Sequence, residues 1–280
     1  MQSLNVSKRT IDLSQYRKRK AALSDCARFV AEDTVVYMDD KPVLAYWHRL
    51  DNDLTTLRAA MDRIKYQEAF RAAKEAMFTR ARTFGYAPRL PLRNQPCRKT
   101  SLALDQPLEH DVLVDAAKTV YDCYRQAFPE QAAKHAEIAE KVLPEYRIGD
   151  TPFTSGIVNA NNPLPYHFDR GNFKGVNSAM IGFKTDIEGG HLTVPELDTA
   201  FAIGDRSLLL FDGQSLLHGV TPFRKMSDKA NRYTIVFYSL EGMWRCDPPG
   251  EEVKSFNRSR TQNERNRVAK DKNRTIPNGQ

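Results

Sequence analysis

The sequence predicts an α+β protein whose centre is a sandwich or barrel of short strands, supported by helices that come earlier in the chain. Between Phe153 and Leu240, short runs rich in β-branched and aromatic residues are separated by Gly, Asp and Asn at intervals of roughly 10–15 residues. Before them, two predicted helices end before Pro129 and Pro144. Because 41% of the 280 residues are hydrophobic, the chain can bury a sizeable core.

The first third of the chain contains the earliest predicted elements. Residues 1–30 are expected to form a basic arm that leads into a short helix. The segment VVYMDDKPVLAYW (35–47) predicts a strand, a turn at the two aspartates and a second strand. From residue 54 to about 84 there is neither Pro nor Gly, and the apolar spacing predicts a long helix. The three prolines of 85–97 then predict a loop.

Two further helices, over about 111–127 and 130–143, complete this N-terminal part. We therefore expect a helical support region with basic segments over 1–150, a strand-rich core over 151–245 and a basic tail over 246–280. The tail is polar and follows a Pro-Pro-Gly break, so it is predicted to be mobile when unbound.

The formal net charge of +7 is unevenly distributed. Residues 1–28, 58–99 and 251–280 are strongly basic, and the remainder of the chain is acidic overall. A basic periphery suits a polyanionic partner, because each Lys or Arg near a phosphate releases counterions. Solvated helix faces and a disordered tail would produce the same charge runs.

Several classes of protein are disfavoured by the sequence. No apolar stretch approaches the roughly 18–20 residues that cross a bilayer, and the N-terminus lacks the apolar region of a secretory signal. We therefore expect no membrane partner. The cysteines lie far apart in the chain and form no CxxC pair, which favours reduced thiols in an intracellular protein over a disulfide framework or a zinc site. They are Cys26, Cys97, Cys123 and Cys246.

Three residues of the strand-rich block are candidate metal ligands. His167 and Asp169 are two apart, so on a strand both side chains would point to the same face. His218 follows the strand-like run SLLLFDG. Two imidazoles and one carboxylate suit non-haem Fe(II) and leave coordination positions open for other ligands.

An arginine completes this pattern. Arg232 opens the apolar run RYTIVFYSL, and a permanently charged side chain inside a barrel needs an anionic partner such as a carboxylate. His191, with Arg206 fifteen residues beyond it, is an alternative second histidine, but Arg206 lies in a Gly-Asp turn. Neither a nucleophile elbow nor a phosphate-binding loop is present in the sequence.

At these residues the chain resembles the Fe(II)/2-oxoglutarate-dependent dioxygenases, whose core is a double-stranded β-helix (jelly roll). The resemblance covers about 153–240 and implies His167, Asp169 and His218 as iron ligands. It also implies that Arg232 binds the distal carboxylate of 2-oxoglutarate. Thr234, two residues further along the same strand face, could add its hydroxyl to that carboxylate.

Three segments of this block are similar to the TET/JBP branch, which oxidises the 5-methyl group of pyrimidine bases in DNA. They are PYHFDRGN, EGGHLTVPEL and GDRSLLLFDGQSLLHGVTPF. That similarity implies a base contact from Asn172, stacking on the base by Tyr238, and Arg89 near the co-substrate or DNA. Asn172 as a turn residue and Tyr238 as ordinary strand packing are the alternatives. Leu240 stands where animal cytosine readers of this branch carry a base-contacting His, so thymine is a candidate target beside the favoured 5-methylcytosine.

The resemblance thus implies a dioxygenase that converts a 5-methylpyrimidine in double-stranded DNA to its 5-hydroxymethyl form, with the base flipped out of the helix. It implies Fe(II), 2-oxoglutarate and O2, with ascorbate as a stimulant. The cytoplasm or nucleoid is the expected location, and a virus or phage is one candidate source. A protein or small-molecule hydroxylase of the prolyl-hydroxylase type, and a non-catalytic DNA-binding jelly roll, are the competing interpretations.

Overall fold

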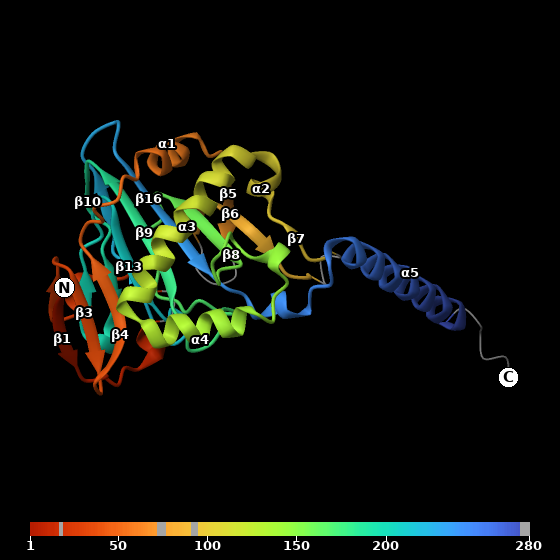
Figure 1. Cartoon of the computed structure of the whole chain (residues 1–280), viewed down its shortest axis with the longest axis horizontal. Helices are drawn as coiled ribbons and strands as arrows, with labels where there is room; N and C mark the ends of the chain where they lie inside the picture. The colour runs from red at the N-terminus through yellow and green to blue at the C-terminus, as the bar shows by residue number, and fades with distance from the viewer. Residues whose placement is uncertain (17–18, 72–76, 91–94, 275–280) are drawn as a thin grey trace.

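The computed structural model describes residues 1–16, 19–71, 77–90 and 95–274. Helices lie across one face of a large twisted sheet, and a last helix projects away from the body (Figure 1). The helices are α1 (Thr55–Arg63), α2 (Ser101–Asp105), α3 (Pro107–Ala127), α4 (Pro129–Ala139) and α5 (Pro249–Arg274). None of the helices in these ranges is long and apolar enough to span a bilayer.

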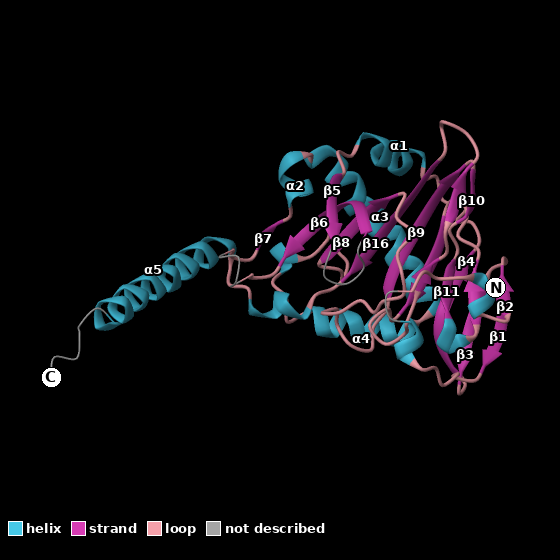
Figure 2. Ribbon diagram, turned by 180° about the vertical axis from the view of Figure 1, so that it is seen from behind, coloured by secondary structure: helices cyan, strands magenta, loops and turns pink. Residues whose placement is uncertain are grey.

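The described strands form a large sheet, a small sheet and a separate pair (Figure 2). The large sheet has the order β1 (Gln2–Val6), β3 (Thr34–Met38), β4 (Lys41–Trp47), β13 (Ser207–Phe211), β9 (Ser178–Thr185), β16 (Asn231–Tyr238), β8 (Ser155–Ala160), β6 (Met77–Ala87) and β5 (Gln67–Arg71), with β7 (Arg98–Lys99) beside β6. The small sheet has the order β14 (Gly219–Val220), β11 (Leu192–Val194), β12 (Thr199–Phe201) and β2 (Arg28–Val30). The pair is β10 (Ile187–Gly189) with β15 (Phe223–Lys225).

The two faces of the large sheet pack against different layers, helices on one side and the small sheet on the other. On β13, Leu208 and Leu210 pack in the cluster that includes the buried face of α3, whereas Leu209 and Phe211 pack with residues of the small sheet. Side chains of a strand point alternately to opposite faces, so one short apolar run can serve both layers. Two sheets enclosing one core, with helices outside the larger one, confirm the predicted α+β jelly roll.

Several predicted elements are confirmed. The hairpin of 35–47 is β3 and β4, and Asp39 and Asp40 form its turn with φ of 52° and 59°. Asp tolerates this left-handed region better than most residues. The helices expected over 111–127 and 130–143 are α3 and α4, and each begins with a proline at its first turn.

The long helix expected over 54–84 is wrong. Helix α1 ends at Arg63, and the chain continues as β5 and β6. On β6, Arg82 and Phe84 are buried while Thr83 between them is exposed, which is strand alternation. Residues 1–150, predicted to be helical, thus also supply strands to the same sheet as the core. The part of this prediction that falls on 72–76 lies outside the described residues.

The tail expected to be mobile is a helix over its described part, because α5 extends to Arg274 and projects from the body in both views (Figures 1 and 2). Glu251 and Glu252 lie in its first turn, where their negative charges interact favourably with the positive end of the helix dipole. Its exposed pairs, Lys254 with Glu251 and Arg260 with Glu264, have the three- and four-residue spacing of helix neighbours. Residues 275–280 lie outside the described part.

The expectation of four reduced cysteines is also wrong. Cys97 and Cys246 form a disulfide across 149 residues, with their Cα atoms 5.8 Å apart, while Cys26 and Cys123 are free thiols. The absence of a CxxC pair in the sequence could not exclude this bond, since the fold brings together two segments that are distant in the chain.

Candidate metal centre and co-substrate pocket

The two predicted histidine ligands are fixed to each other through their backbones. His167 N–H donates to the carbonyl of His218 at 2.9 Å, and His218 N–H donates back at 3.1 Å. This isolated antiparallel bridge holds the ring centroids 4.3 Å apart. The expectation that His167 and Asp169 share a strand is wrong, because both lie in an irregular segment and this bridge sets their positions.

Asp169 completes the group. Its N–H donates to the Gly213 carbonyl at 2.9 Å. The carboxylate then lies 3.6 Å from His167 Nε2 and 3.9 Å from His218 Nε2. One possible ligand atom from each of the three residues lies within 4.8 Å of the others. A Cβ at residue 213 would lie 2.5 Å from Asp169 Oδ2, so only glycine leaves room for the carboxylate there.

The protonation of the two histidines suits metal binding. His167 Nδ1 is 2.8 Å from the Pro165 carbonyl, and His218 Nδ1 is 2.9 Å from the Leu216 carbonyl. With a proton on each Nδ1, the lone pair of each ring lies on Nε2, on the side of the Asp169 carboxylate. Burial, with His167 nearby, lowers the pKa of His218 to about 4, so its imidazole is neutral at pH 7. Two neutral imidazoles and one carboxylate are the donor set of non-haem Fe(II) sites.

Arg232 is buried and lacks a full set of partners. The residue is 1% exposed, its Nε donates to the Gly190 carbonyl at 3.2 Å, and its Nη2 has no hydrogen-bond partner among the described residues. Burial lowers the pKa of Arg232 to about 10. A buried guanidinium with an unsatisfied N–H needs an anion, and a carboxylate fits its planar fork.

Other basic groups surround the Arg232 guanidinium. Burial, together with the charge of Arg232, lowers the pKa of Lys184. Burial and these two cations lower the pKa of His191 to about 4, and its buried Nδ1 has no partner in the described part of the chain. His191 therefore interacts with these two cations and is absent from the metal-binding group found among the described residues. A 2-oxoglutarate carboxylate would supply the missing negative charge here.

The metal group and Arg232 line one cavity of about 710 Å³, within the usual range for small-molecule sites. Arg232, Thr234, Val236 and Tyr238 all line it, as alternate residues of β16 should. Thr234 Oγ1 accepts from Asn159 Nδ2 at 3.3 Å. Four of the predicted co-substrate and base contacts are therefore beside the metal group: Arg232, Thr234, Asn172 and Tyr238.

Asn172 is held within the wall of this cavity. Its Nδ2 donates to Ser178 Oγ at 3.1 Å, and its backbone bridges that of Leu240. Its side chain is therefore held against β9 and its backbone against the residues that follow β16.

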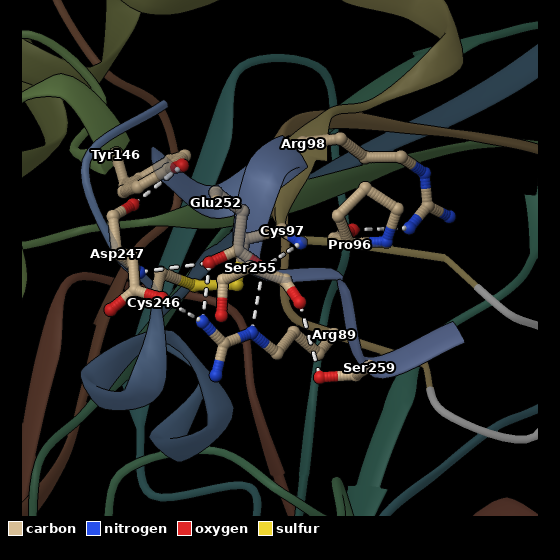
Figure 3. Close-up of polar contacts among 10 residues, drawn as sticks. All are labelled: Arg89, Pro96, Cys97, Arg98, Tyr146, Cys246, Asp247, Glu252, Ser255 and Ser259. Atoms are coloured by element: carbon tan, nitrogen blue, oxygen red, sulfur yellow. Dashed lines mark hydrogen bonds and ion pairs between the residues drawn. A yellow bond between two sulfur atoms is a disulfide. The ribbon is translucent and has the colours of Figure 1, made fainter. Parts of the chain in front are cut away.

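Arg89 does not line this cavity, so the expectation that it lies near the co-substrate is wrong, while a contact with DNA stays a prediction. Its guanidinium contacts both carboxylate oxygens of Glu252 at 2.6 Å and Asp247 at 2.6 Å (Figure 3). Glu252, with a fully buried side chain, also accepts from Cys97 N–H and Asp247 N–H, each at 2.9 Å. Arg89 therefore joins the first turn of α5 to the loop that carries Cys97.

Sequence reasoning missed other residues that line the cavity. Asn162 Nδ2 donates to the Asn159 side chain at 3.1 Å, which extends the polar wall beside Thr234. The run VNANN was a possible signal for this pair, because amides inside a strand-rich core need partners. Leu13 and Tyr16 line the cavity from the N-terminal segment, and no local sequence signal places that segment there.

Comparisons with known proteins agree with this geometry. The Tet_JBP family model, described as the oxygenase domain of the 2OGFeDO superfamily, matches residues 88–241. Proteins named bifunctional helicase and thymine dioxygenase JBP2 are similar over shorter stretches. The one from Trypanosoma brucei brucei is 32% identical over 119 residues, covering 42% of this chain and 11% of the relative. The one from Trypanosoma cruzi is 28% identical over 132 residues, covering 47% and 12%.

These matches span about a tenth of the curated relatives' length. A solved structure described as NgTET1 in complex with 5mC DNA aligns with a TM-score of 0.59 at 12% identity, covering 86% of this chain and 88% of that one, and so shares the fold. The family match includes the metal group and Arg232 and spans more than half of the chain. The chain therefore belongs to the Tet_JBP family of 2-oxoglutarate- and Fe(II)-dependent oxygenases.

Proposed function

We propose that this protein hydroxylates the 5-methyl group of a pyrimidine in DNA, with 5-methylcytosine and thymine as the two candidate bases. The observation that carries the proposal is a cavity lined both by the metal group, His167, Asp169 and His218, and by Arg232 with its unsatisfied Nη2. Family membership implies Fe(II), 2-oxoglutarate and O2. The names of the relatives, which specify a thymine dioxygenase, and of the structural neighbour, which specifies 5mC DNA, support the DNA base.

The residues of the chain would have distinct roles. His167, Asp169 and His218 would hold Fe(II), which together with 2-oxoglutarate and O2 supplies the oxidation of a C–H bond. Arg232 and Thr234 would bind the distal carboxylate of 2-oxoglutarate and so fix its orientation. The apolar walls around β16 and β13 would keep water away from the metal.

The target base would enter this cavity after leaving the duplex stack, because a stacked methyl group cannot reach a recessed metal. Asn172 would hydrogen-bond the base edge, and Tyr238 would lie against its face. DNA as substrate also supports the expected location in the cytoplasm or nucleoid. Ascorbate would stimulate turnover by keeping the iron ferrous.

Mass analysis of nucleosides tests the proposal. Duplexes with 5-methylcytosine, with unmodified cytosine, or with thymine as the sole methylated base are incubated with Fe(II), 2-oxoglutarate and ascorbate, then digested. We expect a 5-hydroxymethyl nucleoside that is lost in His167→Ala and kept in His48→Ala, an exposed histidine outside the cavity. Succinate released only with a peptide or metabolite would contradict a DNA substrate, and DNA retention without any turnover would contradict an enzyme.

A further inference from the structure

Part of the wall of the catalytic cavity comes from the N-terminal segment, described over residues 9–16 and 19–25. It connects β1, in the large sheet, with β2, in the small sheet, so both of its ends are anchored. Within it, Leu13 and Tyr16 line the cavity. The Arg19 carbonyl accepts from Tyr166 N–H at 3.1 Å, which attaches the segment to the residue directly before the ligand His167.

Side chains strengthen this attachment. The rings of Tyr16 and Tyr166 meet edge to face, 5.0 Å between centroids. Tyr166 Oη donates to Asp25 Oδ2 at 2.6 Å and accepts from Thr193 Oγ1 at 3.0 Å. Arg19 pairs with the same Asp25. The short helix η1 (Leu13–Tyr16) is thus held in a fixed position relative to the metal group.

Leu13 is 50% exposed although it lines the cavity, so it lies at the mouth. A single exposed leucine is ordinary on a protein surface. Arg170, the residue after the ligand Asp169, is a second exposed residue that lines the same cavity. Arg170 is exposed and makes no hydrogen bond or ion pair with any residue in the described ranges. An apolar tip and an unpaired cation therefore share the entrance.

Duplex DNA needs both of these groups at such an entrance. Removing a base from the stack costs a few kcal/mol and leaves a gap between its neighbours. Proteins that open base steps fill such gaps with an apolar side chain, leucine among them. An exposed arginine beside the opening can bind the phosphate of the displaced nucleotide.

We propose that Leu13 is a positioning residue that enters the gap left by the flipped base, while Arg170 binds an adjacent phosphate. This inference rests on the proposed function and extends it to the mechanism of base extrusion. The proposal predicts that Leu13 matters only for duplex DNA, because a single strand has little base stacking to disrupt. Arg170 should matter for both forms, because a single strand keeps its phosphates.

The experiment uses the full chain and one oligonucleotide with a single 5-methylcytosine among thymines, offered as a duplex and as a single strand. Leu13→Ala should lower the ratio of duplex to single-strand kcat/KM about tenfold. Leu13→Met, which keeps an apolar tip, should retain the wild-type ratio. Arg170→Gln should weaken binding of both forms and reduce the salt slope by about one.

Leu23→Ala is the matched control, since Leu23 is 45% exposed in the same segment but does not line the cavity. The single-strand rate of Leu13→Ala reports its folding within the same measurement. An unchanged ratio in Leu13→Ala, or an equal loss on both substrates, would overturn the proposal.

A second measurement separates this inference from the proposed function. 2-Aminopurine beside the 5-methylcytosine brightens when the neighbouring base leaves the stack, whether or not oxidation follows. The wild-type protein could oxidise neither base and still raise the 2-aminopurine fluorescence of the duplex in a way that depends on Leu13. In that case the proposed function fails, and the insertion of Leu13 into the duplex is supported. If the wild-type protein leaves the 2-aminopurine fluorescence unchanged, the proposed insertion of Leu13 is wrong.

Discussion

Gly213 illustrates how one residue without a side chain fixes a metal ligand. Its carbonyl accepts from Asp169 N–H, and a Cβ at this position would collide with the Asp169 carboxylate. Gly213→Ala should therefore displace that carboxylate and weaken metal binding by about 10–100-fold, the usual effect of disturbing groups behind a ligand. Anaerobic calorimetric titration with Fe(II) measures the affinity. Gly250→Ala, where an added Cβ meets nothing within 4 Å, should bind the metal as wild type does.

Arg232 is expected to bind 2-oxoglutarate and to lower the stability of the protein when that ligand is absent. It is buried with an unsatisfied Nη2, so Arg232→Met should leave the melting temperature of the ligand-free protein unchanged or raise it. The same variant should lose the stabilisation that saturating 2-oxoglutarate gives with Fe(II), about 2.7 kcal/mol at a hundredfold excess over Kd. Thermal melting with and without the diacid checks both parts. Equal stabilisation of variant and wild type would exclude Arg232 as its anchor.

The residue types of the metal group could be predicted because the chemistry demands them. His167, Asp169, His218 and Arg232 lie as the sequence pattern and the family resemblance indicated. Arg89 was mispredicted because a basic residue in a motif-like segment has no local mark that distinguishes an anchor for another element from a ligand contact. Its partners, Asp247 and Glu252, follow it by more than 150 residues.

Among the elements, α4 contains a buried histidine that should make stability depend on pH. Burial lowers the pKa of His135 from 6.5 to about 3, and its Nε2 contacts Ser239 Oγ at 2.8 Å. Between these pH values the unfolded chain binds a proton that the folded chain excludes, so stability falls as the pH drops from about 6.5 towards 3. His135→Phe should flatten this part of the pH profile by up to one proton. Denaturant melts at several pH values test it, and an identical slope would argue against the effect.

The attachment of α5 predicts a contrast between a buried and an exposed ion pair. Arg89→Met leaves the Glu252 carboxylate, whose side chain is fully buried, without its cation and should cost about 3 kcal/mol. Arg125→Met removes a largely exposed pair with Asp122 and should cost less than about 1 kcal/mol. Denaturant unfolding compares the two. Hydrogen exchange should also show faster opening of the first turn of α5 in Arg89→Met only.

The mispredicted elements share one physical cause. The segment 54–84 has helix-forming composition, yet β6, which begins within it and ends at Ala87, pairs with β8 along Ala81–Gly85 and with β7 at Tyr86 and Ala87. Tertiary pairing therefore overrode local propensity, which contributes only tenths of a kcal/mol per residue. Helices α3 and α4 were predictable because each ends before a proline, Pro129 and Pro144 respectively. Only the attachment of the first turn of the tail helix, through Glu252 to Arg89 and Cys97, depends on contacts that the sequence of the tail cannot reveal.

At the scale of the whole molecule, the basic tail should contribute to DNA affinity through its charge. Deletion of 258–280 removes seven basic and two acidic residues but keeps Cys246 and Glu252, so the attachment of the first turn survives. The slope of log affinity against log salt should become shallower, by about 0.9 for each phosphate that the tail neutralises in the full chain. Fluorescence anisotropy of a labelled duplex at several salt concentrations measures it. An unchanged slope would show that the tail does not touch DNA.

The fold class and the place of the strand-rich core along the chain could be predicted because alternating apolar runs and turn residues are local signals. The joining of the first hundred residues to the same sheet could not, since β1, β3 and β4 extend it on one side and β5 to β7 on the other. The same holds for the disulfide between Cys97 and Cys246.

The two parallel strands near the amino terminus have a consequence for biosynthesis. β1 joins β3 early in the chain, but β2 pairs in the described structure with β12, whose residues Thr199–Phe201 are made much later. At about 5–20 residues per second, roughly 10–30 s separate the two on the ribosome. Strand β2, although it is made within the first thirty residues, is therefore among the last strands to find its partner, and a chaperone has that interval in which to protect it.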